Sequence, residues 1–185
     1  MRRLYVSGYR SYELGIFDKK DKRLFYLKEF LKEEFRRYAD SGLEWVITSG
    51  NLGIELWAGL ALIDLNEELS QLNLALLLPY KGFGNNWNDD NRKLLTKVVE
   101  GADYVNLTSQ DEYKHGGQLK GNAQFILNNS DGLLLVYDPD KKGKPAFLYD
   151  QARAYSQAMG YPVHTINFEE LQEFVIDYQE IHNVK

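Results

Sequence analysis

The residues best suited to chemistry lie in one short loop, Ser49-Gly50-Asn51-Leu52-Gly53-Ile54-Glu55. The loop follows an apolar run typical of a buried strand and leads straight into a segment with helical periodicity. Backbone N–H groups at the start of a helix, together with the positive end of its dipole, favour a phosphate or carboxylate, and Gly50 and Gly53 permit close approach. The loop therefore predicts one wall of an anion-binding site.

Glu55 narrows this chemistry. A carboxylate in the first turn stabilises the helix dipole, but beside a ligand it repels phosphate and accepts hydrogen bonds from hydroxyl or amino groups. The expected ligand thus carries both a phosphate and such groups. The alternative is a tight strand-to-helix turn at Gly50 and Gly53, with Glu55 favouring the helix start.

The loop matches neither G-x-G-x-x-G nor the phosphate-loop pattern, so the usual dehydrogenase and NTPase fingerprints are absent.

A second candidate segment, Gly8-Tyr9-Arg10-Ser11-Tyr12, follows the first apolar run of the chain. Arg10 can form a forked contact with a phosphate, and Tyr9 or Tyr12 can stack on a base. A surface arginine beside edge-packed tyrosines is the alternative. The position after a strand favours a binding role for Gly8 and Arg10.

The aromatic residues and the residue types used in catalysis indicate a function less clearly than these two segments do. Trp57, near a helix start, and Trp87, in an asparagine-rich loop, are candidate cleft residues, whereas Trp45 is expected in the core. The chain has no cysteine, and no metal site or catalytic triad is expected around its three histidines. If the protein is an enzyme, Glu55 is the candidate catalytic residue.

Composition restricts the class of protein. The 185 residues, 44% of them hydrophobic, predict a single domain over residues 1–185. The absence of cysteine and of a long apolar segment predicts a cytoplasmic location and no membrane insertion. A net charge of −5 disfavours nucleic acid as a partner.

These residues must be positioned by alternating strands and helices. We expect strands at 4–7, 43–48, 73–79, 103–107, 132–137 and 162–166, and helices at 24–38, 54–72, 89–100, 118–129, 146–159 and 168–178. This order predicts an α/β fold with a Rossmann-like doubly wound, mostly parallel sheet and helices on both faces. Ligands of such sheets bind beyond the carboxyl ends of the strands, so the loops there are expected to share one cleft.

Three motifs carry a resemblance to a known family: Gly8-Tyr9-Arg10, Glu13-Leu14-Gly15-Ile16-Phe17 and Gly50-x-x-Gly53-x-Glu55. Together they resemble the YpsA-like family of small Gram-positive bacterial proteins, within the LOG/DprA-like nucleotide-sensing (SLOG) superfamily of Rossmann-like fold. The resemblance spans nearly the whole chain. It implies that the ligand cleft is lined by Gly8, Arg10, Gly50, Gly53 and Glu55, with Trp57, Trp87 and Asn122 as neighbours and Gly143 in the turn after the fifth strand.

Two positions depart from the family pattern. Lys142-Gly143-Lys144 stands where a Gly-Gly-Thr-like turn is expected, and Gly121-Asn122 where an Arg-Asn pair is expected, with Lys120 as a substitute charge. These departures bear on the identity and affinity of the ligand.

The resemblance implies a regulatory sensor that binds a nucleotide-derived ligand such as ADP-ribose or NAD. The alternatives are a hydrolase of nucleotide N-glycosidic or phosphate bonds, with Glu55 as acid or base, and DprA-like binding of single-stranded DNA. The LOG signature Pro-Gly-Gly-x-Gly-Thr-x-x-Glu is absent, which disfavours the hydrolase. The expected partners are the small molecule, a protein of a regulatory pathway and a second copy of the chain.

Overall fold

The computed structural model describes residues 1–69 and 71–183 and contains one parallel sheet. Its strands stand side by side in the order β4-β3-β2-β1-β5-β6, and every neighbouring pair is parallel. The strands are β1 (Arg3–Gly8), β2 (Trp45–Thr48), β3 (Asn73–Leu78), β4 (Tyr104–Leu107), β5 (Gly132–Val136) and β6 (Val163–Ile166). The predicted doubly wound α/β fold is confirmed, with a sheet that is parallel throughout.

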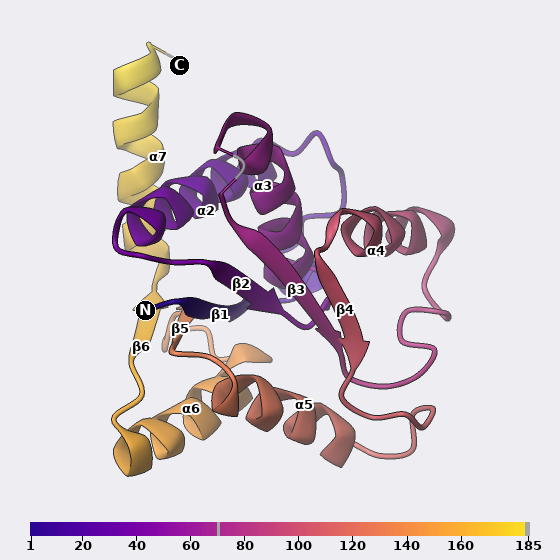
Figure 1. Cartoon of the computed structure of the whole chain (residues 1–185). Helices are drawn as coiled ribbons and strands as arrows, with labels where there is room; N and C mark the ends of the chain where they lie inside the picture. The colour runs from indigo at the N-terminus through magenta and orange to yellow at the C-terminus, as the bar shows by residue number, and fades with distance from the viewer. Residues whose placement is uncertain (70, 184–185) are drawn as a thin grey trace.

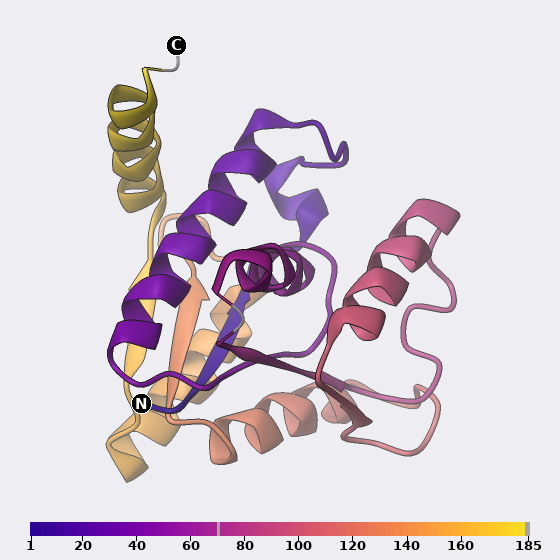
Figure 2. The ribbon, with the colours of Figure 1, turned by 45° about the horizontal axis from the view of Figure 1, so that its top comes forward.

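Helices cover both faces of this sheet. Figure 1 shows α5 and α6 below the sheet and α2 and α3 above it, and Figure 2 shows α7 beside α2. The helices are α1 (Ser11–Leu14), α2 (Lys22–Asp40), α3 (Ile54–Leu69), α4 (Asp89–Gly101), α5 (Gly117–Asn128), α6 (Pro145–Met159) and α7 (Phe168–His182). In the described part of the chain no helix is long and apolar enough to cross a membrane.

Three helices differ from the sequence prediction, and one of them, α7, continues past its predicted end at 178 to His182. The short α1 was not predicted, because four residues are too few to display a helical period. The helix predicted to reach residue 72 ends at Leu69, and position 70 lies outside the described residues. The side-chain amide of Asn66 donates to the carbonyl of Leu72 at 2.6 Å, so the chain after the helix folds back onto its last turn.

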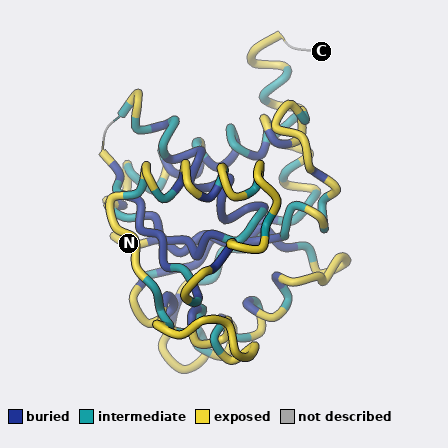
Figure 3. The backbone as a smooth tube through the Cα atoms, turned by 90° about the vertical axis from the view of Figure 1, so that its right-hand side faces the viewer, coloured by how far each residue is buried: buried dark blue, intermediate teal, exposed yellow. Residues whose placement is uncertain are grey.

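The core of the molecule centres on β1 and α3. The N-terminal part of α3, from Ile54 to Leu62, is buried without interruption, because this helix packs on the sheet between α2 and α4. Figure 3 shows the buried segments, in dark blue, gathered in the middle of the molecule and the exposed segments at its periphery. The N-terminus of α3 is therefore fixed from all sides.

Strand order also determines where a ligand can bind. From β1 the chain adds β2, β3 and β4 on one side, then returns to place β5 and β6 on the other side of β1. The loops after β1 and β5 thus lead to opposite faces of the sheet, which opens a crevice at their carboxyl ends. The sequence predicts a ligand cleft at this edge of the sheet.

Gly53 ties the loop before α3 to the segment after β1. The backbone N–H of Ile54 donates to the Tyr9 carbonyl at 3.1 Å, and that of Ser11 donates to the Leu52 carbonyl at 3.3 Å. Gly53 has a φ of +112°, and a Cβ added there would lie 2.3 Å from the Tyr9 carbonyl oxygen. Only glycine permits this approach of two backbones.

We predict that Gly53→Ala lowers the free energy of unfolding by about 2–4 kcal/mol, since it adds a steric clash to an unfavourable φ. The matched control is Gly42→Ala, because Gly42 has a φ of +99° but nothing within 4 Å of an added Cβ. Its cost is expected to be about 1 kcal/mol. Urea denaturation of both variants measures the difference, and equal losses would contradict the close-packing role of Gly53.

Candidate functional site

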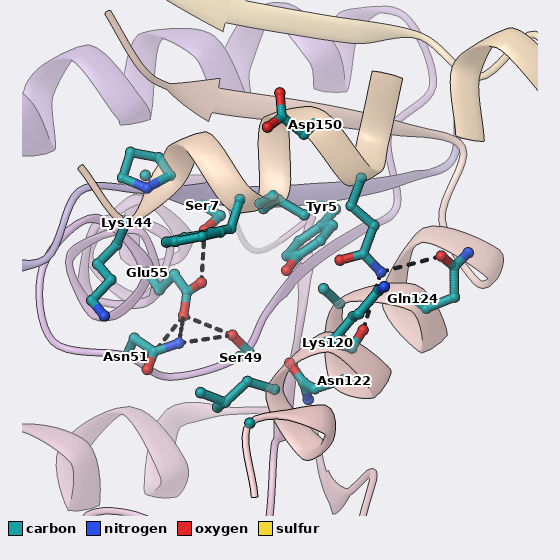
Figure 4. Close-up of a pocket in the computed structure, with 18 of the residues that line it drawn as sticks. Tyr5, Ser7, Ser49, Asn51, Glu55, Lys120, Asn122, Gln124, Lys144 and Asp150 are labelled. Carbon is teal, nitrogen blue, oxygen red and sulfur yellow. Dashed lines mark hydrogen bonds between the residues drawn. The ribbon is translucent and has the colours of Figure 1, made fainter. Parts of the chain in front are cut away.

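A cleft of about 870 Å³ opens between α5 and α6 at the carboxyl end of β1. Its floor is formed by Tyr5, Ser7 and Gly8 of β1, and its walls come from the loop after β2, α5 and the N-terminal part of α6. Tyr5 and Ser7 share one face of the sheet because side chains alternate along a strand. Figure 4 shows the labelled side chains converging on this space.

The Glu55 carboxylate is the most highly coordinated group of the cleft. It is 3% exposed, and its Oε2 accepts a hydrogen bond from Ser7 Oγ at 2.7 Å. Its Oε1 accepts bonds from Ser49 Oγ at 2.7 Å, from the backbone N of Asn51 at 2.9 Å and from Asn51 Nδ2 at 2.7 Å. These donors come from β1 and the loop after β2, so the carboxylate at the start of α3 joins the elements that frame the cleft (Figure 4).

The two carboxylate oxygens of Glu55 differ in how many further hydrogen bonds they can accept. A carboxylate oxygen can accept about two hydrogen bonds in good geometry, so Oε1 with three donors is saturated, whereas Oε2 with one donor retains an open position. Glu55 thus retains the capacity to accept a hydrogen bond from one hydroxyl or amino group. The donors Ser7 and Ser49 were not singled out from the sequence, because their role depends on contacts between strands.

Tyr5 lies next to this carboxylate on the floor. Its side chain is 2% exposed, yet it contributes to the lining of the cleft. Burial, followed by the negative charge of Glu55, holds the pKa of Tyr5 well above its usual range. The phenol is therefore protonated at physiological pH and can donate a hydrogen bond.

Positive side chains line the rim. Arg10, Lys120 and Lys144 all contribute to the cleft, and none of their side chains forms an ion pair or hydrogen bond within the described residues. Glu13 fixes two of them through their backbones: its Oε2 accepts from Arg10 N and its Oε1 from Lys144 N, both at 2.7 Å. The loops after β1 and β5 are thus held together by one carboxylate.

Tyr9 reinforces this connection between the two loops. It is fully buried, so it cannot stack on a base as considered from the sequence. Its hydroxyl donates to the Asp138 carbonyl at 3.1 Å and accepts from Asp138 N at 2.9 Å, and its ring stacks on Phe168 at 5.4 Å. Tyr9 therefore acts as a structural support beneath the cleft.

Asn122 reaches the cleft from α5. Its Nδ2 donates to the Leu77 carbonyl and to Thr108 Oγ1, both at 2.9 Å, which ties α5 to the end of β3. Its Oδ1 receives no hydrogen bond from the described residues. Asn122 can therefore present an acceptor to the cleft, where Figure 4 labels it.

Four residues predicted for the site line the cleft, namely Gly8, Arg10, Glu55 and Asn122. Five others lie outside its lining: Gly50, Gly53, Trp57, Trp87 and Gly143.

These five residues lie outside the cleft because each packs against other parts of the protein. Gly50 faces Leu78, Gly53 faces Tyr9 and Gly143 faces Glu13, so the absence of a Cβ serves protein contacts. Trp57 is buried in the core, and Trp87 packs edge-on against Phe83 at 5.2 Å.

The glycine loop also differs from the predicted anion site in its backbone. The N–H of Asn51 donates to Glu55 and that of Ile54 donates to Tyr9. These two N–H groups are consumed within the protein and cannot bind a phosphate. The loop instead shapes the cleft by holding the Glu55 carboxylate in place.

Comparison with known proteins agrees with this architecture. Residues 4–171 match the YpsA family model, described as the YspA SLOG family. The chain belongs to this family. A UPF0398 protein of Enterococcus faecalis is 44% identical over 177 residues, covering 96% of this chain and 98% of that relative. The UPF0398 protein YpsA of Bacillus subtilis is 38% identical over 172 residues, covering 93% of this chain and 96% of the relative. The family resemblance inferred from the motifs is confirmed.

A solved structure shares the fold. DNA processing protein A (DprA) from Streptococcus pneumoniae matches with a TM-score of 0.60 and 13% sequence identity. The match covers 98% of this chain and 56% of the DprA chain. The YpsA family member described here therefore has a fold that DprA also contains.

We predict that Glu55→Gln lowers the free energy of unfolding by about 2–4 kcal/mol, because the amide cannot accept from all four donors and brings its own N–H groups against them. The control is Glu34→Gln on α2, a glutamate 5% exposed that pairs with Arg37 alone. Glu34→Gln is expected to lower the free energy of unfolding by about 1 kcal/mol. Chemical denaturation at neutral pH compares the two, and a Glu55→Gln protein no less stable than the control would refute the proposed linking role.

Proposed function

We propose that this YpsA family member binds a nucleotide-derived ligand, such as ADP-ribose or NAD, in the cleft between α5 and α6. In this proposal it acts as a regulatory sensor whose ligand-bound form alters contact with a protein partner. The observation that carries the proposal is the pairing of unpartnered cations, Arg10 and Lys144, with a buried carboxylate that has one open acceptor position. Such a cleft complements a molecule with both phosphates and hydroxyl or amino groups.

The cationic side chains support a phosphate subsite at the rim. Lys144 and Pro145 begin α6, whose positive dipole end adds to the charge of Arg10 and Lys144, and Lys120 lies on the opposite wall. The backbone N–H of Lys144 is taken by Glu13, so the phosphate contacts in this proposal come from the side chains. The proposed ligand thus places its diphosphate between these cations.

Apolar side chains support a place for the base. Leu119 of α5 and Phe147 of α6 line the cleft and are 40% and 73% exposed. An exposed phenylalanine offers its face for stacking, and apolar walls with few polar groups are usual in small-molecule sites. The cleft volume of about 870 Å³ is sufficient for a dinucleotide-sized ligand.

The surroundings of Glu55 favour binding over hydrolysis. Four protein donors occupy the carboxylate, which suits a fixed acceptor better than a group that must take up and release a proton. We therefore expect no release of free base when nucleoside monophosphates are incubated with the protein. Base release that Glu55→Gln abolishes, measured by chromatography, would instead support the hydrolase.

We predict that Arg10→Ala and Lys144→Ala each weaken binding of ADP-ribose by about tenfold, because each removes one charge from the phosphate subsite. Isothermal titration calorimetry on protein freed of co-purified ligand measures the effect. Lys142→Ala is the matched control, since Lys142 belongs to the same loop but does not line the cleft. Its affinity should equal that of the unaltered protein.

Two results would contradict the proposal. If the unaltered protein gives neither heat nor a thermal shift with ADP-ribose, NAD or common nucleotides, the nucleotide assignment fails. If it binds but Lys142→Ala weakens binding as much as Lys144→Ala does, the ligand does not occupy this cleft.

A further inference from the structure

Tyr5 brings a buried polar group to the floor of the cleft. Its side chain is only 2% exposed on the floor of the cleft, and Ser49 is the residue that forms a hydrogen bond with its hydroxyl. This hydrogen bond is the smallest of the influences on the pKa of Tyr5, and the Ser49 hydroxyl also donates to Glu55 at 2.7 Å.

Two of the other three buried tyrosines differ from Tyr5 in the surroundings of their hydroxyls. Tyr9 bonds to Asp138 through its hydroxyl, and Tyr161 bonds to Ser130 Oγ at 2.7 Å. Both hydroxyls thus find partners within the protein, as buried polar groups generally do. Tyr5 alone of these three directs its hydroxyl into a cleft that a ligand can enter.

The hydroxyl of Tyr5 can donate a hydrogen bond to a ligand, and the open position of Glu55 can accept one from it. The protonated phenol can donate a hydrogen bond, whereas the Glu55 carboxylate can only accept one. A ligand group that satisfies both must accept from Tyr5 and donate to Glu55. A hydroxyl does both with one oxygen, and a vicinal diol does so with two adjacent oxygens.

We propose that Tyr5 and Glu55 together recognise a ribose hydroxyl or vicinal diol of the bound ligand, and that Tyr5 determines the preference for ribose over deoxyribose. The inference rests on the proposed nucleotide site and specifies which part of the ligand lies on the floor. The sugar then occupies the depth of the cleft, below the cations of Arg10 and Lys144 that receive the phosphates. Removal of the phenol oxygen eliminates the donor without altering the ring that packs in the core.

Tyr5→Phe tests this assignment by calorimetric titration with three probes. The first is ADP-ribose, and the others are its analogues that lack the vicinal hydroxyls on the adenosine ribose or on the terminal ribose. The unaltered protein is expected to bind one analogue at least fivefold more weakly than ADP-ribose. Tyr5→Phe should bind ADP-ribose about five- to tenfold more weakly, with the preference over that analogue reduced by the same factor.

Stability separates this role from a structural one. Because the hydrogen bond with Ser49 is the smallest influence on the pKa of Tyr5, Tyr5→Phe should unfold at nearly the same urea concentration as the unaltered protein without ligand. The matched control is Tyr161→Phe, which loses the bond to Ser130 and should be less stable but keep the full ligand preference.

The outcomes are distinct. An unaltered protein that binds all three probes equally, or a Tyr5→Phe protein with unchanged affinity and preference, overturns the role of Tyr5 and leaves the nucleotide site in place. Equal weakening of all three probes by Tyr5→Phe also overturns it, because the hydroxyl would then contact another part of the ligand. An unaltered protein that binds none of the probes removes the proposed function and this inference with it.

Discussion

The buried carboxylate of Glu55 is the constraint on which the cleft depends. Removing an ionised carboxylate from water costs several kcal/mol unless hydrogen bonds replace its hydration. Here the replacement requires Ser7 from β1 and Ser49 and Asn51 from the segment after β2 to converge on the first turn of α3. The relative positions of these elements, and hence the shape of the cleft floor, follow from that requirement.

A second glutamate plays a similar part at the rim. Glu13 accepts from the backbone of Arg10 after β1 and from that of Lys144 before α6. The two loops that diverge at the centre of the sheet are thereby tied to one another, and their cationic side chains are left without ion-pair partners in the described chain. Both glutamates thus organise a site whose remaining hydrogen-bonding and charge capacity faces the cleft, where we propose that a nucleotide-derived ligand binds.

Much of the fold was predictable because it rests on periodicity. The strands and long helices repeat apolar residues at spacings visible in the sequence, and the strand-to-helix order determines a parallel sheet. The short α1 shows no such repeat. The apolar surface of α3 surrounds the helix at its N-terminal end, since α3 is packed from several sides, and a sequence pattern does not identify those neighbours.

The site was only partly predictable. Arg10 and Glu55 stand out because their charges follow strands and glycines, and the structure places both in the cleft. The glycines of the same loop were interpreted as making room for a ligand, whereas Gly53 makes room for the backbone of Tyr9. Tyr5 gave no signal because it looks like any aromatic residue in a strand. Its significance depends on its place in the cleft beside Glu55, which only the three-dimensional arrangement reveals.

The most direct test of the account is a crystal structure of the protein with bound ADP-ribose. We predict that the diphosphate lies between the side chains of Arg10 and Lys144, with a ribose hydroxyl within hydrogen-bonding distance of Glu55 Oε2 and the Tyr5 hydroxyl. A ligand bound outside the cleft between α5 and α6, or one in the cleft with its phosphates held by the backbone of the loop before α3, would contradict it.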